Sequence, residues 1–240
     1  MENSKKIKIV VLTGSGISAE SGLTTFRDAD GLWEQYKVED VCTHSAWENN
    51  PEKLVDFYNM VRRKIKEAKP NEAHLELTRL QQYFPDMEII TQNVDDLHER
   101  AGSKNILHLH GEINKLRPEN NINGGFVNCD GDEVYGDTDE TGSLLRPHIV
   151  FFGEDVPNMP KASEIAKNAD IFIIIGTSLQ VYPAAYLLND VSIDSEIYIV
   201  DPNVAEPVYN SYFKHIKKNA TEGVKEVVDE IIEKYVKNEK

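Results

Sequence analysis

The segment most informative about the fold is Ile7-Lys8-Ile9-Val10-Val11-Leu12-Thr13-Gly14-Ser15-Gly16-Ile17-Ser18-Ala19, near the start of the chain. Residues 7–13 are largely apolar, which is typical of a strand buried in a parallel sheet. The turn that follows fits G-x-G-x-x-G/A between a strand and a helix, a pattern that favours dinucleotide binding. There Gly14 permits a tight turn, Gly16 admits a pyrophosphate, Ala19 allows close packing, and the helix N-terminus supplies amide donors. An ordinary strand-turn-helix is the alternative.

Helical and strand patterns alternate along the rest of the chain. Helices are expected at residues 51–66, 72–83 and 223–236, and strands at 87–91, 106–109, 148–152, 171–176 and 197–201. This order predicts an α/β fold with a Rossmann-like parallel sheet and a site at the carboxyl ends of its strands. Residues 114–143 are rich in Asn, Gly and Asp without a clear period, so we expect an irregular insertion or small module there.

Charge and composition exclude several classes of protein. The 240 residues carry 26 Lys and Arg against 41 Asp and Glu, a net charge of -15, which argues against nucleic-acid and anionic-membrane binding. Apolar runs are too short to cross a bilayer, and the N-terminus lacks a signal peptide, so a cytoplasmic location is expected. Two distant cysteines, Cys42 and Cys129, supply neither a disulfide framework nor a four-thiolate zinc site.

Polar residues follow several predicted strands. Gln92, Asn93 and Asp95 come directly after residues 87–91 and offer donors and acceptors for a ribose or a carboxamide, although Asn93 or Asp95 can equally cap the next helix. The remaining strand ends carry Gly176, Thr177 and Ser178, which suit phosphate or ribose, and Asp201, which suits an adenosine ribose. Strand-end capping is the alternative for these as well.

The segment His108-Leu109-His110-Gly111-Glu112 is the best candidate for acid–base chemistry. Histidine changes protonation near neutral pH and is therefore the usual general base. His108 and His110 share a face in an extended segment, which also allows a metal pair, but no third ligand accompanies them at a suitable spacing. We therefore predict that His110 is the base.

Taken together, these stretches resemble the sirtuin family. The matching segments are G-S-G-I-S-A-E-S-G at 14–22, T-F-R-D-A-D-G-L-W at 25–33, T-Q-N-V-D-D-L-H-E-R-A-G at 91–102, L-H-L-H-G-E at 107–112, L-R-P-H-I-V-F-F-G-E at 145–154 and G-T-S-L-Q-V-Y-P-A-A at 176–185, with the Ala220 region after them. The resemblance implies a Rossmann-like core (residues 1–30, 76–111 and 147–240) and a smaller module formed by two insertions (about 31–75 and 112–146).

The resemblance also implies an activity, NAD-dependent removal of acyl groups from lysine, with NAD consumed as a co-substrate. The acyl oxygen attacks the ribose carbon as nicotinamide leaves, His110 is the base on a ribose hydroxyl, and O-acyl-ADP-ribose and free lysine result. The implied partners are acyl-lysine proteins or peptides, bound without nucleic acid or membrane, and a monomer is compatible with this.

Motif position assigns the site residues. Catalytic roles fall to His110 and Asn93. NAD binding falls to Gly14, Ser15, Gly16, Ala19, Glu20, Phe26, Arg27, Trp33, Gln92, Asn93, Asp95, His110, Gly176, Thr177, Ser178, Asp201 and Ala220. Substrate binding falls to Ala29, Tyr58, Val61, Arg62, Val150, Phe152, Gly153, Glu154, Val181 and Tyr182, with residues 150–154 and 181–183 pairing with the peptide backbone.

Two departures from the family pattern narrow the prediction. Many sirtuins bind structural zinc through four cysteines, whereas only Cys129 lies in that region, so no zinc is expected; a solvated acidic loop is expected at residues 130–140. Sirtuins that prefer succinyl or malonyl lysine carry Tyr-x-x-Arg, but here Val61 follows Tyr58 at the arginine position and Arg62 lies about 100 degrees further around the helix. Ala29 is small, as in that subgroup. We expect a deacetylase with broad acyl tolerance, and desuccinylase or demalonylase activity depends on whether Arg62 substitutes.

Three other functions use the same residues. An ADP-ribosyltransferase or NAD glycohydrolase would release nicotinamide without a lysine product. A catalytically idle NAD-sensing module would bind NAD without turnover. A dehydrogenase is disfavoured because the sequence of residues 21–33 predicts a long loop where a dinucleotide fold of that class has a second strand ending in an acid.

Overall fold

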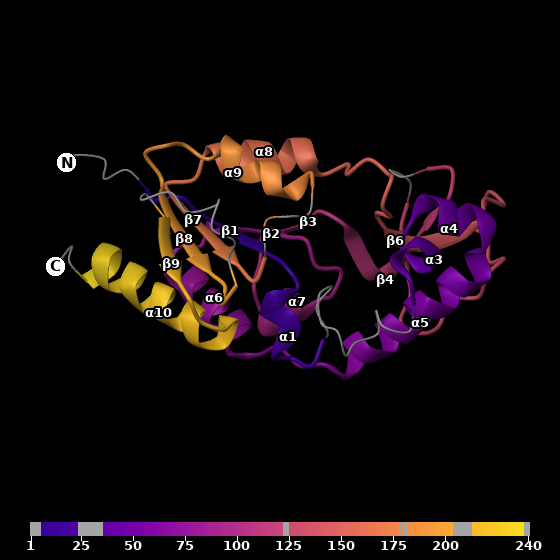
Figure 1. The fold of residues 1–240 in the computed structure, drawn as a ribbon, viewed down its shortest axis with the longest axis horizontal. Helices are drawn as coiled ribbons and strands as arrows, with labels where there is room; N and C mark the ends of the chain where they lie inside the picture. Colours follow the sequence, from indigo (N-terminus) through magenta and orange to yellow (C-terminus); the bar gives the residue numbers. More distant parts are fainter. Residues whose placement is uncertain are drawn as a thin grey trace.

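The computed structural model describes residues 6–23, 36–121, 125–177, 179, 182–203 and 213–237. Its main element is a six-stranded parallel sheet with the strand order β3-β2-β1-β7-β8-β9 (Figure 1). The strands are β1 (Ile9–Thr13), β2 (Glu88–Thr91), β3 (Ile106–His108), β7 (Ile171–Ile175), β8 (Glu196–Val200) and β9 (Phe213–Ile216). The sheet confirms the predicted α/β, Rossmann-like class.

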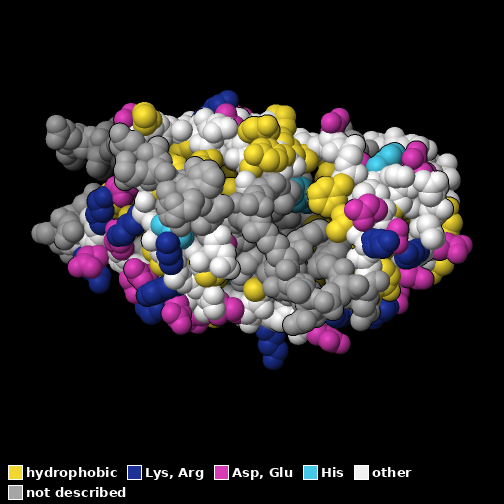
Figure 2. All heavy atoms as spheres, viewed as in Figure 1, with side chains coloured by type: hydrophobic (Ala, Val, Ile, Leu, Met, Phe, Trp, Pro, Cys, Tyr) yellow, Lys and Arg dark blue, Asp and Glu magenta, His cyan; other side chains and the backbone are white. Residues whose placement is uncertain are grey.

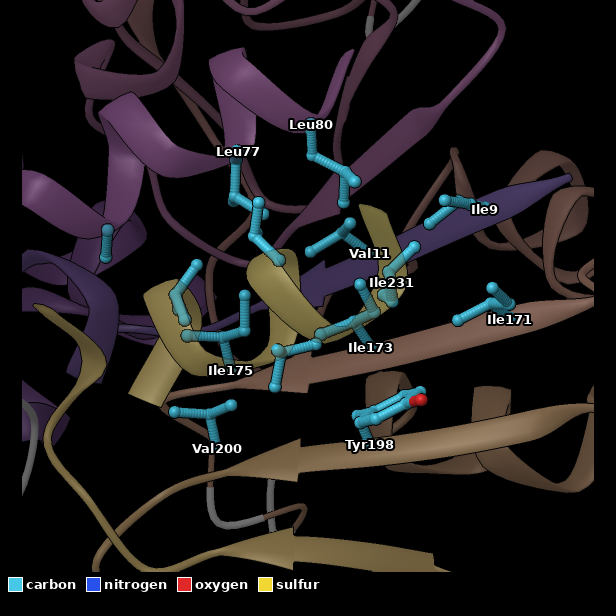
Figure 3. Packing of buried hydrophobic residues seen from close by; sticks show 14 of the residues in the cluster. Ile9, Val11, Leu77, Leu80, Ile171, Ile173, Ile175, Tyr198, Val200 and Ile231 are labelled. Carbon is cyan, nitrogen blue, oxygen red and sulfur yellow. The ribbon is translucent and has the colours of Figure 1, made fainter. Parts of the chain in front are cut away.

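Helices cover both faces of this sheet, because its central strands are apolar on both sides. On one face, Val11 and Ile173 pack against α6 (Glu72–Tyr83) and α10 (Ala220–Ile232), as Figure 3 shows. On the other face, Leu12 packs in a cluster with residues of α8 (Met159–Lys167) and α9 (Leu187–Asp190). The alternation of side chains along β1 thus divides the core into two layers.

Helix starts carry the expected capping residues. Asn50 accepts a hydrogen bond from the Lys53 amide at the start of α5 (Pro51–Glu67), where Pro51 takes the first helical position. Asn71 and His74 form a capping box at the start of α6. The helices expected at residues 51–66 and 72–83 are confirmed. The last helix begins three residues earlier than expected, at Ala220, and continues into a π-helical turn, η3 (Glu233–Lys237).

A smaller module, shown opposite the parallel sheet in Figure 1, is built on a three-stranded antiparallel sheet in the order β5-β4-β6. These strands are β4 (Gly111–Pro118), β5 (Val127–Asn128) and β6 (Leu145–Ile149). They are accompanied by α3 (Val38–Val41), α4 (His44–Asn49) and α5. Trp47, Phe57, Ile113 and Phe151 belong to its apolar core.

Two expectations for this part of the chain were wrong. Residues 114–143 were expected to be irregular, but β4 continues to Pro118 and pairs with β6. The strand expected at residues 148–152 is instead β6, which ends at Ile149 and belongs to the antiparallel sheet. The pairing is non-local, and Arg117 and Arg146 are buried in it, so a search for apolar periodicity misses it.

The order of the strands places the site. From β1 the chain proceeds outward to β2 and β3 on one side, and later to β7, β8 and β9 on the other. The reversal lies between β1 and β7, and ligands of open α/β sheets bind at such a point, beyond the carboxyl ends of the strands. Within the described ranges, no helix has both the length and the apolar character that a membrane crossing requires.

Candidate functional site

A cavity of about 720 Å³ opens at the carboxyl ends of the parallel strands. Among the residues expected to bind the cofactor, it is lined by Gly14, Ser15, Gly16, Ala19, Glu20, Gln92, Asn93, Asp95, His110, Gly176, Thr177, Asp201 and Ala220. Among those expected to bind substrate, it is lined by Tyr58, Val61, Val150, Phe152, Gly153, Glu154 and Tyr182. Phe26, Arg27, Ala29, Trp33, Ser178 and Val181 lie outside the described residues.

The glycine turn after β1 packs directly on the end of β7. The amides of Gly14 and Gly16 donate to the carbonyl oxygens of Ile175 (3.0 Å) and Gly176 (2.9 Å). A Cβ atom on Gly16 would lie 2.6 Å from the Gly176 Cα, so backbone packing alone requires glycine there. These two amides are therefore used inside the protein, where they fix the turn onto the end of β7.

A hydrogen-bonded group at the centre of the cavity joins the loop after β1 to the loop after β2. Ser18, in the short helix α1 (Gly16–Ala19), accepts a bond from the Asn93 side-chain amide (3.1 Å) and donates to the Asp95 carboxylate (3.0 Å). All three residues are buried, and burial raises the pKa of Asp95. Ser18 was not among the predicted site residues, although it lies within the glycine motif.

The helix-capping alternative applies to one of the two candidates. Asp95 also accepts a hydrogen bond from the amide of Leu97, the first residue of α7 (Leu97–Ala101), at 3.1 Å. Asn93 does not cap this helix, since its side chain bonds to Ser18. Asp95 therefore has a structural role in addition to lining the cavity.

His110 has one ring nitrogen fixed by the backbone. Its Nδ1 lies 2.9 Å from the Gln92 carbonyl oxygen, which only accepts, so Nδ1 carries the hydrogen. Burial lowers the pKa of His110, and the bond to Gln92 opposes this shift. Gly111 follows with φ of +88°, and a Cβ atom there would lie 1.9 Å from the His148 carbonyl oxygen. The glycine after His110 is thus required by close packing on β6.

The far end of the cavity is formed by α1, β8 and α10. The Glu20 carboxylate accepts hydrogen bonds from the amide (3.0 Å) and hydroxyl (2.8 Å) of Thr221, in the first turn of α10. Asp201 follows β8, and its carboxylate accepts a bond from the Asn203 amide at 2.7 Å. Glu20 therefore ties two lining segments together, while Asp201 shapes the loop after β8.

Comparison with known proteins identifies the family. The sequence pattern of the Sir2 family matches residues 14–183. The chain belongs to the Sir2 family. It is 52% identical over 194 residues to an NAD-dependent protein deacylase of Aggregatibacter actinomycetemcomitans, an alignment covering 81% of this chain and 92% of that protein.

Solved structures agree with this assignment. A Sir2 homolog–NAD complex has a TM-score of 0.84 and 35% identity, covering 95% of this chain and 90% of that one. A Sir2 protein with a deacetylated p53 peptide and 3'-O-acetyl ADP ribose has a TM-score of 0.75 and 29% identity, covering 97% and 95%. The parallel sheet and its small module are therefore the Sir2 architecture.

The side of this cavity that carries the predicted substrate-binding residues is mostly apolar. The Tyr58 hydroxyl donates to the Cys42 thiol at 3.7 Å, and its ring packs against Phe57 and Phe151. Burial raises the pKa of the Cys42 thiol to about 12, so it stays neutral. Cys42 and Phe151 line the cavity but carry no motif that would have marked them in the sequence.

Arg62, which was predicted among the substrate-binding residues, does not line the cavity. Its side chain is buried in the small module, where Nε donates to the Ile113 carbonyl oxygen (2.9 Å) and an Nη atom donates to Asn59 (2.6 Å). The other Nη atom lies 3.9 Å from the Glu133 carboxylate. The 100-degree offset along α5 turns Arg62 away from Tyr58 and Val61.

Glu154 and Phe152 line the cavity but are already engaged within the protein. The Glu154 carboxylate accepts bonds from Arg146 (2.7 Å) and from the Phe151 amide (2.9 Å), and it lies 3.8 Å from Arg117. The backbone amide of Phe152 donates to the Cys42 carbonyl oxygen (2.8 Å), and the Phe152 carbonyl oxygen accepts from the His44 backbone amide (3.0 Å). Backbone pairing with a peptide therefore cannot use both polar groups of Phe152.

The acidic loop is organised by its own hydrogen bonds. Asp139 accepts bonds from the Thr141 amide (2.8 Å), the Thr141 hydroxyl (2.7 Å) and the Ser143 amide (2.9 Å). Within the part of the chain that the structure describes, no group of three or more His, Cys, Asp or Glu side chains is arranged to hold a metal ion.

Proposed function

We propose that this chain is an NAD-dependent protein-lysine deacylase that yields nicotinamide, O-acyl-ADP-ribose and unmodified lysine. The observation that carries the proposal is the position of His110 beside Asn93 and Asp95 in one cavity at the β1–β7 reversal. Relatives named NAD-dependent protein deacylases, and a related structure containing NAD, support it. A structure holding a deacetylated p53 peptide supports acyl-lysine peptides as the substrate class.

The residues of the cavity fit a dinucleotide. Asn93 and Asp95 present an amide and a carboxyl group in a buried setting, where ribose hydroxyls and a carboxamide would complete their hydrogen bonds. Bound NAD supplies the activated bond to nicotinamide and the ribose that accepts the acyl group. The apolar side around Tyr58 and Phe151 excludes water from the reacting groups.

His110 acts as the base through Nε2. Because Nδ1–H is held by the Gln92 carbonyl, a neutral imidazole presents an Nε2 lone pair that can take a proton from a ribose hydroxyl. Burial lowers the pKa of His110, which keeps it neutral at physiological pH. We expect kcat/KM to fall as the pH drops through that lowered pKa.

Mass spectrometry of an acyl-peptide incubated with NAD tests the proposal. Wild-type protein should give deacylated peptide and O-acyl-ADP-ribose, and His110→Ala should lose about 10²–10⁴-fold in rate. Lys225→Ala, an exposed change on α10, is the matched control and should leave the rate unchanged. Nicotinamide release without deacylated peptide would instead support a glycohydrolase or ADP-ribosyltransferase, and NAD binding without turnover would support a sensing module.

We infer that neutral acyl groups such as acetyl are preferred over succinyl and malonyl. Val61 offers no charge to an acyl carboxylate, and Arg62 is committed to Asn59, Ile113 and Glu133. An unpaired carboxylate next to Tyr58 and Phe151 would be costly to bury.

Substitution of Val61 tests this preference. Val61→Arg places a guanidinium on the cavity side of α5 and should raise the ratio of succinyl to acetyl kcat/KM by about 10-fold or more. Val61→Leu is the control of similar polarity and should leave the ratio unchanged. Lys64 lines the cavity and is exposed, so Lys64→Ala belongs in the same series. If the wild type prefers succinyl lysine and Lys64→Ala abolishes that preference, the inference is contradicted.

A further inference from the structure

His108 and His110 hold two consecutive carbonyl groups of the loop after β2. His108 Nδ1 lies 3.1 Å from the Asn93 carbonyl oxygen, and His110 Nδ1 lies 2.9 Å from the Gln92 carbonyl oxygen. His108 is buried behind the cavity and does not line it, whereas His110 does. The two histidines thus fix the backbone of the segment that carries Gln92 and Asn93 into the cavity.

Hydrogen-bond acceptors determine the protonation state of His108. Its second ring nitrogen, Nε2, lies 2.9 Å from the Glu99 carboxylate in α7. A carbonyl oxygen and an ionised carboxylate can only accept, so both ring nitrogens of His108 must donate, and the ring is an imidazolium. In the described residues His110 has a bond only at Nδ1, and its Nε2 stays available as an acceptor. The hydrogen bonds of His108 thus require a charged ring, whereas those of His110 permit a neutral one, which the lowered pKa of His110 favours.

The charges around His108 agree with this geometry. Burial alone would lower the pKa of His108, but the bond to Glu99 and the charges of Glu99 and Glu112 raise it above its ordinary value. Asp95 also lies within electrostatic range, as do the rings of His98 and His148, both of whose pKa values are lowered mainly by burial. Carboxylates from α7, β4 and the loop after β2 thus surround the ring.

We propose that His108 is a positioning residue: an imidazolium braced by Glu99 that fixes the Gln92–Asn93 backbone against His110. This rests on the proposed deacylase function. The Asn93 side-chain amide donates to the Ser18 hydroxyl, and the Asn93 backbone amide donates to the Thr91 hydroxyl (3.1 Å). The bond from His108 to the Asn93 carbonyl oxygen is the third hydrogen bond that fixes this residue. Loss of this third bond would let Asn93 move, together with the neighbouring Gln92 carbonyl that orients His110. Small displacements of catalytic groups lower the rate of reaction strongly.

Kinetics of matched variants test the proposal. His108→Leu removes both bonds and should lower kcat about 10- to 100-fold while the KM for acyl-peptide changes far less. His108→Asn keeps an amide donor at the position of Nδ1 and should recover part of the lost kcat. His74→Leu is the control, because His74 is also buried and hydrogen-bonded but caps α6 away from the cavity; it should lower Tm without lowering kcat.

A second readout does not depend on catalysis. In ¹⁵N NMR of the imidazole groups, both nitrogens of His108 should carry protons at pH 7, and Glu99→Gln should shift this titration to lower pH. A neutral His108 at pH 7, or His108→Leu with the kcat of the wild type, would overturn the positioning role. If wild-type protein makes no O-acyl-ADP-ribose, the deacylase proposal fails by itself, and the NMR result still reports the state of His108.

Discussion

In the six-stranded sheet most of the fully buried side chains are aliphatic, as Ile173 and Val11 are, and none is charged among the described residues, whereas in the small module Arg146 is almost as deeply buried as they are. The guanidinium of Arg146 lies between the Glu154 carboxylate and the ring of Phe151, 3.9 Å from the ring centroid. Apolar burial is stabilising wherever it occurs, but a buried charge is stable only with its partner in place. We therefore expect the sheet to tolerate small changes in volume and the module to be sensitive to changes in charge.

The largest effect is expected from Arg146→Ala. It leaves the Glu154 carboxylate with the exposed His44 (2.9 Å) and the more distant Arg117 (3.8 Å), and it should lower the free energy of unfolding by about 3–5 kcal/mol. Urea unfolding of the purified variant measures this. A double variant, Arg146→Met with Glu154→Gln, removes both charges at similar volume and should recover much of the loss. A loss below about 1 kcal/mol in Arg146→Ala would mean that the pair does not stabilise the module.

A smaller, pH-dependent effect is expected at Glu133. Its side chain is fully buried and neither carboxylate oxygen is hydrogen-bonded within the described residues, so burial raises its pKa to about 7. Asp137 adds to this shift and Arg62 opposes it. A carboxyl with a raised folded-state pKa stabilises the fold below its unfolded value of 4.5, and this contribution is lost as the pH rises through about 7.

Glu133→Gln isolates that contribution. Between about pH 4.5 and 8 the free energy of unfolding of the wild type should fall by about 3 kcal/mol relative to that of the variant. Urea unfolding at three pH values measures the difference, and Asp132→Asn, at an exposed neighbour, is the control. Parallel pH curves for wild type and Glu133→Gln would show that the buried carboxyl does not titrate in this range.

In the sheet, Ile173→Val should have a modest effect. It removes one methylene from the layer between β7 and α10 and should cost about 0.5–1.5 kcal/mol, independent of pH. Urea unfolding at pH 6 and 8 measures this. A cost that changes with pH, or exceeds that of Arg146→Ala, would remove the contrast between the two regions.

The smallest effect is expected on the surface. Lys225 and Asp229 form an exposed pair one helical turn apart on α10, and such pairs contribute little because water and salt screen them. Lys225→Ala should leave the urea midpoint unchanged within error.

On the face shown in Figure 2, acidic and basic side chains are interspersed toward the two ends, and hydrophobic side chains gather above the centre, over α8 and α9.

Much of the parallel sheet could be predicted because its signals are local. The apolar runs of β1, β2, β7 and β8 each end in a glycine or polar residue, and the strands were expected within two residues of their observed bounds. Strand β9 and helix α8 were not expected. All of the predicted cofactor residues within the described ranges line one cavity, since parallel strands bring their carboxyl ends to one edge.

The small module was predicted poorly because its stability comes from contacts between distant segments. Nothing near Arg62 in the sequence indicates that Glu133 and Ile113 will bind it, and the helical offset alone left its direction open. Cys42 and Phe151 likewise enter the cavity through packing, without a motif. Arg62, which was predicted to bind substrate, instead binds residues of the small module.

The α/β class, the glycine turn and the prediction of His110 as the base could be reached from the chain alone, because strand periodicity and motif order are local properties. Other features became visible only in the folded protein: Gly16 is required by contact with Gly176, Arg62 turns away from the cavity, and His108 bonds to two acceptors. Burial and hydrogen-bond partners set the protonation and the direction of a side chain, and those partners come from residues far apart in the sequence.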